Sequence, residues 1–139
     1  MKYWRLISVV VVFSFVAIAI NNVREKRSQQ RRDVAYQTAL RSYSEAIKLG
    51  MTRKDVEDSL HARNGAFLQM CCVDIRKPWG VLDDLVKIGQ EDSPWFCSTK
   101  DVYIAFQFAG TRPQATPPSA DPSDRVTAVT VYPLLEGCL

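Results

Sequence analysis

The sequence predicts an α+β fold, with an N-terminal transmembrane helix and then two helices packed on an antiparallel sheet of three or four strands. An uncharged stretch lies near the start, an apolar period close to 3.6 residues runs to about residue 65, and a period of two follows. Because the helices precede the strands instead of alternating with them, α+β is favoured over α/β. We expect a signal-anchor at 1–23, a basic neck at 24–35 and a domain at 36–139.

The signal-anchor prediction depends on residues 6–20, which carry no charged side chain. Extending this segment to residues 3–23 gives about 31 Å of helix, and a bilayer core is about 30 Å thick. Tyr3 and Trp4 lie where an interfacial aromatic belt is expected. A cleaved signal peptide is the alternative, because residues 17–19 resemble a cleavage site. The basic residues directly after that site favour an anchor that stays in the chain.

Charge is divided unevenly along the chain. Residues 1–54 contain eleven Lys and Arg against three acidic residues, whereas residues 55–139 contain seven against twelve. An acidic domain argues against a nucleic-acid partner, which would require positive charge on the domain itself. The basic neck is typical of a segment that lies near anionic lipid headgroups.

The orientation in the membrane has arguments on both sides. The basic neck would place the domain in the cytoplasm by the positive-inside rule. An even number of cysteines and an anchor that begins at residue 3 favour export. We expect a single-pass protein with an extracytoplasmic domain.

Residues 24–49 are predicted to form a helix. Its apolar stripe consists of Tyr36, Leu40, Tyr43 and Ile47. The stripe covers less than two heptads, so we expect it to dock on the domain's own sheet instead of forming a coiled coil. Gly50 ends this helix, and Thr52 is expected to cap a second helix through the N–H of Asp55.

Asn64-Gly65 ends the second helix, whose Val56 and Leu60 should face inward. Beyond it, alternation and apolar runs predict strands at 66–73, 85–89, 102–108 and 125–132. The first is expected to be mostly buried, and the second to be bounded by a turn at Asp83-Asp84. Residues 109–124 contain four prolines and are predicted to form a long mobile hairpin loop.

The segment Leu49-Gly50-Met51-Thr52-Arg53-Lys54-Asp55-Val56-Glu57 resembles the L-x-G-M-T-x-x-x-V region of the small outer-membrane lipoprotein family SmpA/OmlA. This resemblance implies two helices on a three-stranded sheet, a fold shared with β-lactamase inhibitory protein. It also implies a bacterial envelope module that acts by contact and not by catalysis. In such an envelope the extracytoplasmic domain expected above would be periplasmic. The chain departs from the family in lacking a lipidated cysteine and in having Leu60-His61 where Leu-Gly is frequent.

Cysteines are the first candidate site residues. A bridge between Cys97 and Cys138 would fix a tail that would otherwise fray. Cys71 and Cys72 are adjacent in a predicted strand, so they point to opposite faces. Both are interpreted as small buried apolar residues, and the absence of Cys-x-x-Cys argues against redox catalysis.

No pattern in the sequence supports catalysis, a metal or a cofactor. His61 is expected on an exposed part of the second helix, and a lone histidine does not make a zinc site or a catalytic triad. The pairs Asp83/Asp84 and Glu91/Asp92 are interpreted as solvated turn residues instead of acid–base pairs. We therefore expect a non-enzymatic protein without cofactor.

Aromatic residues in loops give the remaining candidates: Trp79, Trp95 and Phe96. They either cover the edges of the core or form a contact surface for a protein partner, where Trp is favoured as an anchor. The leading functional hypothesis is a membrane-anchored, non-enzymatic interaction or scaffold module of the cell envelope. The alternative is a cytoplasm-facing, cysteine-based sensor or ligand-binding domain.

Overall fold

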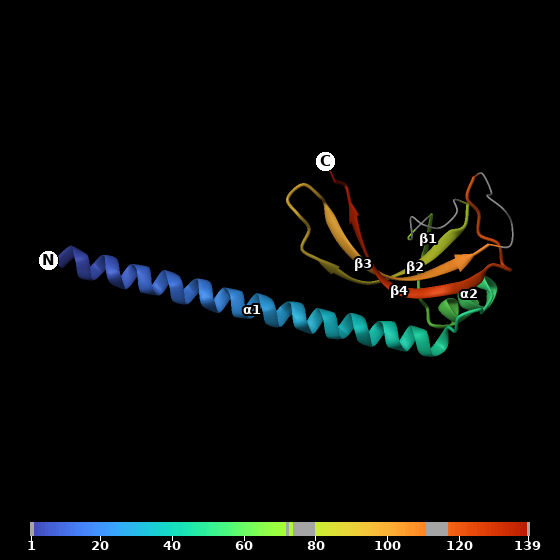
Figure 1. The fold of residues 1–139 in the computed structure, drawn as a ribbon, viewed down its shortest axis with the longest axis horizontal. Coiled ribbons are helices and arrows are strands. Elements are labelled where there is room, and N and C mark those ends of the chain that lie inside the picture. The colour runs from blue at the N-terminus through green and yellow to red at the C-terminus, as the bar shows by residue number, and fades with distance from the viewer. Residues whose placement is uncertain (1, 72, 74–79, 111–116, 139) are drawn as a thin grey trace. The chain divides into compact units, whose positions relative to one another are not determined.

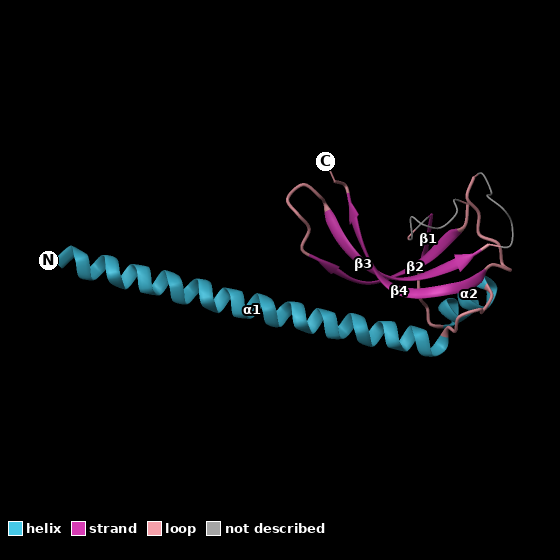
Figure 2. Cartoon of the chain, in the orientation of Figure 1, coloured by secondary structure: helices cyan, strands magenta, loops and turns pink. Residues whose placement is uncertain are grey.

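The computed structural model describes residues 2–71, 73, 80–110 and 117–138, and its description of side chains begins at Phe15. The chain divides into two compact units, Met1–Ala35 and Tyr36–Leu139. The second unit combines the end of helix α1, helix α2 and one four-stranded antiparallel sheet (Figure 1, Figure 2). The prediction of an α+β fold with two helices and an antiparallel sheet is confirmed.

Helix α1 spans Lys2–Ala46, and its last three turns belong to the second unit. The predicted stripe is buried: Tyr36 and Ile47, the residue after the helix end, are buried, and Leu40 and Tyr43 pack against the core. The Tyr43 ring meets Phe106 edge-on, with 5.7 Å between ring centroids. This burial agrees with docking of the stripe on the sheet of the same chain, since an apolar helix face is stabilised by the surface that it covers.

The corner between the two helices forms as the sequence predicts. Gly50 has a φ of 84°, the left-handed conformation that favours glycine after a helix. Helix α2 spans Arg53–Ala62, and the Thr52 hydroxyl accepts a hydrogen bond from the N–H of Asp55 at 3.3 Å. Asn64, with a φ of 54°, follows the helix.

The sheet has the order β1-β2-β3-β4, and all its neighbouring strands are antiparallel. Its strands are β1 Leu68–Cys71, β2 Leu82–Glu91, β3 Thr99–Ala109 and β4 Arg125–Glu136. In Figure 1 the four strands form one curved sheet with α2 beneath one end. Ile104, Phe106 and Phe108 of β3 face the main core with Val56 and Leu60, whereas Tyr103 and Ala105 pack in a smaller cluster.

All four strand predictions were wrong in extent; β3 begins at Thr99 and ends at Ala109 instead of spanning 102–108. β1 has four residues and is exposed or half-buried, although the sequence predicted a mostly buried strand at 66–73. β2 is longer than 85–89 and includes Asp83 and Asp84, so the predicted turn is absent from that position. β4 continues past Tyr132 to Glu136, because Pro133 lies on an edge strand, where a missing N–H is tolerated.

The described ends of the loop between β3 and β4 are ordered by backbone hydrogen bonds. Ser119 donates to the carbonyl of Gly80 at 3.1 Å, and Leu82 donates to Ser119 at 3.4 Å. Residues 111–116 of the predicted mobile loop lie outside the described residues.

Candidate functional site

Among the residues that the structure describes, the most exposed aromatic side chains of the domain lie in the loop that joins β2 to β3. Trp95 is 93 % exposed and Phe96 is 41 % exposed. Their rings meet edge-on with 5.8 Å between centroids, so the two side chains form one apolar projection. We call Trp95 and Phe96 the aromatic tip.

The sequence left two interpretations of these aromatic residues open: they cover the edges of the core, or they form a contact surface for a protein partner. Trp95 does not cover the edge of the core, because nearly all of its surface is in contact with solvent. A fully exposed indole is unfavourable in water, and such side chains are typical of contact sites in protein interfaces. Trp79, the third candidate, lies outside the described residues.

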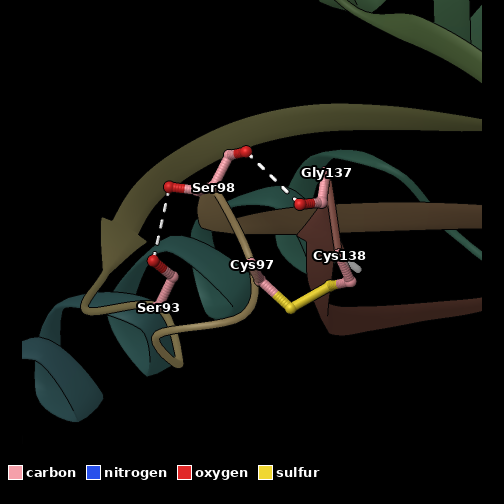
Figure 3. Close-up of a disulfide and its surroundings, with 5 residues drawn as sticks. All are labelled: Ser93, Cys97, Ser98, Gly137 and Cys138. Carbon is pink, nitrogen blue, oxygen red and sulfur yellow. Dashed lines mark hydrogen bonds between the residues drawn. A yellow bond between two sulfur atoms is a disulfide. The ribbon is translucent and has the colours of Figure 1, made fainter.

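The loop carrying the aromatic tip is joined covalently to the C-terminus. Cys97, next to Phe96 in the chain, forms a disulfide with Cys138, as the sequence predicted (Figure 3). Cys97 is buried, and its N–H donates to the carbonyl of Pro94 at 2.9 Å. In this turn Trp95 and Phe96 are exposed, whereas Cys97 is buried.

Hydrogen bonds on either side of the disulfide hold the same segment. The N–H of Ser98 donates to the carbonyl of Glu136 at 2.9 Å, and its hydroxyl lies 3.4 Å from the carbonyl oxygen of Gly137 (Figure 3). The Ser93 hydroxyl donates to the carbonyl of Ser98 at 3.3 Å. Gly137 has a φ of 61°, and a Cβ there would collide with the Ser98 hydroxyl. These contacts fix the base of the aromatic tip.

A second feature, which sequence reasoning missed, is a buried charge cluster centred on Arg53. This side chain is 1 % exposed although it begins helix α2. Nη1 lies 2.6 Å from Oδ1 of Asp84, Nη2 lies 3.4 Å from Oδ2 of Asp124, and Nη2 also donates to the carbonyl of Leu82. The guanidinium is stacked 3.9 Å from the centroid of the Phe108 ring. Planar stacking combined with several donors is a geometry that arginine provides and lysine does not.

The carboxylates of the cluster are equally buried, so the interpretation of Asp83 and Asp84 as solvated turn residues was wrong. Both are fully inaccessible within β2. Asp83 accepts hydrogen bonds from the N–H groups of Val73 and Phe108, at 3.2 and 3.0 Å. Burial raises the pKa of Asp84 to about 6, against the opposing effect of the Arg53 guanidinium.

This cluster joins three parts of the domain and is closed to solvent. It connects the start of α2 with β2 and with the turn before β4, where the N–H of Arg53 also donates to the carbonyl of Asp124 at 2.7 Å. A buried group without access to substrate is suited to structure instead of catalysis. The signal in the sequence was the apolar residues on both sides of Asp83-Asp84, which indicate a strand in which two acids require buried partners.

A further polar group lies on the sheet face opposite the helices. Lys87 Nζ lies 2.5 Å from Oδ2 of Asp101, and the Tyr103 hydroxyl lies 3.4 Å from the same oxygen. Burial raises the pKa of Tyr103, and the hydrogen bond to Asp101 raises the pKa of Lys87. Both shifts move the pKa values further above neutral pH, so neither group is prepared to act as a base.

The remaining candidate residues are not assembled into a reactive site. His61 is exposed, with its ring 5.4 Å from that of Phe67. Among the described residues, no three His, Cys, Asp or Glu side chains are grouped to hold a metal ion. Cys71 is half-buried and disulfide-bonded, so its interpretation as a simple buried apolar residue was wrong. Cys72 lies outside the described residues.

The basic neck forms part of α1, in the first unit. Arg27, Gln30, Arg31 and Val34 line one face of the helix there, and the Val34 side chain is 66 % exposed. Within the residues that the structure describes, no helix is long and apolar enough to cross a membrane. Most of the predicted membrane segment consists of residues whose side chains are outside that description.

Comparisons with protein-family models, with curated proteins and with solved structures found no match for this chain.

Proposed function

We propose that the protein is a membrane-anchored, non-enzymatic interaction module of the bacterial cell envelope, which binds a protein partner through its aromatic tip. The observation that carries this proposal is the 93 % exposure of Trp95 on a loop held by a disulfide and by backbone hydrogen bonds. An exposed aromatic anchor on a fixed base loses little conformational entropy when it binds, which favours affinity.

The anchor in this proposal is the apolar segment at residues 3–23, followed by the basic neck at residues 24–35. Such a neck interacts favourably with anionic headgroups, by about 1 kcal/mol for each Lys or Arg near the surface. A cleaved signal peptide would give a secreted domain with the same aromatic tip. The size of the chain after cleavage separates these two outcomes.

An extracytoplasmic domain agrees with the disulfides at Cys97–Cys138 and at Cys71, because disulfides persist in oxidising compartments. The alternative, a cytoplasm-facing sensor based on cysteine chemistry, requires reduced thiols at rest. In intact cells, a maleimide that cannot cross the membrane should label the protein only after reduction. Labelling that requires lysis but no reduction would support the cytoplasmic alternative and contradict the envelope proposal.

The aromatic tip is tested by placing a photoreactive amino acid at position 95 of the full chain in its native membrane. We expect it to crosslink to one defined protein. Leu49, which is 69 % exposed and lies in the corner between α1 and α2, is a matched control position. Equal crosslinking from both positions, or none from position 95, would contradict a partner site at the aromatic tip.

A further inference from the structure

Within the described residues, the outer edge of β4 is the longest stretch of backbone in the sheet without a neighbouring strand. β4 pairs with β3 on one side only. On its other side, the described residues contact its backbone just at the start, where Val126 exchanges hydrogen bonds with Gly50 and Met51. From residue 127 to residue 136 that side has no backbone partner in the described part of the chain. An open edge of this length is a template for another strand.

Three observations establish which residues direct their N–H and C=O groups outward. The N–H of Phe108 donates to Asp83 on β2, so even-numbered residues of β3 point away from β4. Their partners in β4 must then point outward: Val129 pairs with Phe106, Val131 with Ile104 and Pro133 with Val102. Pro133 has no N–H to donate, which agrees with an outward position. By alternation, Leu135 points outward as well.

The side chains along this edge lack the charges that usually protect an open strand. Between Arg125 and Glu136 every residue is uncharged, and β-branched residues occupy four of the six positions from Thr127 to Tyr132. Leu135 is 44 % exposed although it is a large apolar residue. At the opposite edge of the sheet, β1 has only four residues. The domain therefore has one open edge suited to pairing.

We propose that the protein forms a homodimer in which β4 of one copy pairs antiparallel with β4 of a second copy, across a two-fold axis at Tyr132. This register pairs residues 128–136 and so uses nearly all of the open edge. It places Val129 opposite Leu135 of the second copy, and Val131 opposite Pro133. The two chains then form about six interstrand hydrogen bonds. The four outward-pointing residues of each copy would give about eight, and the two proline nitrogens, which carry no proton, remove two of them.

The same register is favoured by the side chains. The exposed Leu135 is covered by the other copy's Val129, and Thr130 lies opposite Leu134. The two Tyr132 rings meet across the axis, where aromatic pairs stabilise neighbouring strands. Glu136 comes diagonally opposite Arg125 of the second copy, on the same face once the bulge at Gln107/Phe108 is included. An axis at Thr130 would shorten the pairing, because Gly50 and Met51 occupy the edge beside Val126.

The test is disulfide crosslinking of single-cysteine substitutions in the full chain, purified in detergent. Across the axis the two Cα atoms at position 132 are expected to lie about 4.5 Å apart, within the range of a disulfide. The Cα atoms at position 130 would lie about 13 Å apart, from four residues at about 3.3 Å each. Tyr132→Cys should therefore give a covalent dimer on mild oxidation, and Thr130→Cys should not. Equal crosslinking of the two variants, or none, would overturn the proposal.

A second measurement uses sedimentation of proteins without an added cysteine. The wild-type chain should sediment with the mass of two copies, and Leu135→Lys should sediment with the mass of one, because it places a charge in the paired edge. Thr127→Lys, on the same strand but beyond the pairing, is the matched control and should stay dimeric. A wild-type monomer, or a dimer that Leu135→Lys leaves intact, would show that the edge of β4 is not the interface.

Discussion

Arg53 illustrates how a single residue can organise a small domain. Its guanidinium contacts two carboxylates and a carbonyl while stacked on Phe108, so the charge is tolerated where solvent is excluded. One nitrogen, Nε, has no hydrogen-bond partner among the described residues, and the same is true of Oδ2 of Asp84. Removing one partner of such a buried pair lowers stability by far more than the intact pair contributes, because the other charge stays buried without a partner.

We expect Arg53→Met to lower the free energy of unfolding by about 3–5 kcal/mol, because it leaves Asp84 and Asp124 buried without a counter-charge. Urea denaturation measures this change. Lys54→Met is the matched control: the lysine is the next residue of α2, its side chain is 67 % exposed, and its pair with Asp58 lies on the surface. The control should change stability by about 0.5 kcal/mol or less. Similar losses in both variants would contradict a structural role for the buried cluster.

The raised pKa of Asp84 predicts a dependence of stability on pH. The native state holds this proton up to about pH 6, whereas the unfolded chain releases it near 3.8. The contribution of Asp84 to stability is therefore fully present below the unfolded pKa and is lost as pH rises through about 6.

Denaturation is measured for the wild type and for Asp84→Asn between pH 3.5 and 7, roughly the interval that brackets the two pKa values. The comparison isolates the contribution of Asp84, since all other carboxyl groups are common to both proteins. Relative to the variant, the wild type should lose stability across that interval, by at most about 1.4 kcal/mol per pH unit. A difference between the two proteins that is constant with pH, or that favours the wild type as pH rises, would show that Asp84 titrates normally.

At the level of helices and strands, local signals predicted most of the domain. The caps at Gly50 and Thr52 and the stripe from Tyr36 to Ile47 depend on neighbouring residues, which a sequence displays directly. The boundaries of β2 were not predictable in this way. Its two aspartates are stabilised by Arg53 and by backbone N–H groups of β3 and Val73, which are distant in sequence.

The candidate site also has one part that could be predicted from the sequence and one part that could not. The bridge between Cys97 and Cys138 was predicted from the number of cysteines and from the need to hold the tail. The exposure of Trp95 could not be predicted, because an aromatic residue in a loop is compatible with either a buried or an exposed position. The turn at Pro94–Cys97 determines that Trp95 is exposed. This turn depends on contacts of Ser98 with Glu136 and Gly137, which are distant in sequence.

The disulfide should stabilise the end of the sheet as an element. Replacing both Cys97 and Cys138 by Ser should lower the free energy of unfolding by about 2–4 kcal/mol, because the crosslink closes a loop with a sequence separation of 41 residues. Denaturation under oxidising conditions measures the loss. When both proteins are reduced, their free energies of unfolding should be equal. Equal stabilities under oxidising conditions would mean that hydrogen bonds around Ser98 hold the segment without the bridge.

For the molecule as a whole, charge is divided along nearly the same boundary as the two compact units. The acidic residues are concentrated in the unit Tyr36–Leu139, and the unit Met1–Ala35 contains the apolar segment and the whole basic neck. In the proposed function, electrostatic and hydrophobic attachment to a membrane are combined in this unit, and the two respond differently to salt. Electrostatic attraction is screened over about 3 Å in 1 M salt, whereas burial of apolar surface in a bilayer is not weakened by it.

This difference gives a test of the anchor in the full-length chain. We expect the protein to sediment with membranes and to remain there after a wash in about 1 M salt, at which surface charge attraction is screened. Detergent should release it, because only detergent replaces the hydrocarbon around residues 3–23. A chain of residues 36–139 is the matched control and should be recovered without membranes. If the unprocessed full-length chain is released by salt alone, the basic neck accounts for its attachment and the apolar segment does not lie in the bilayer.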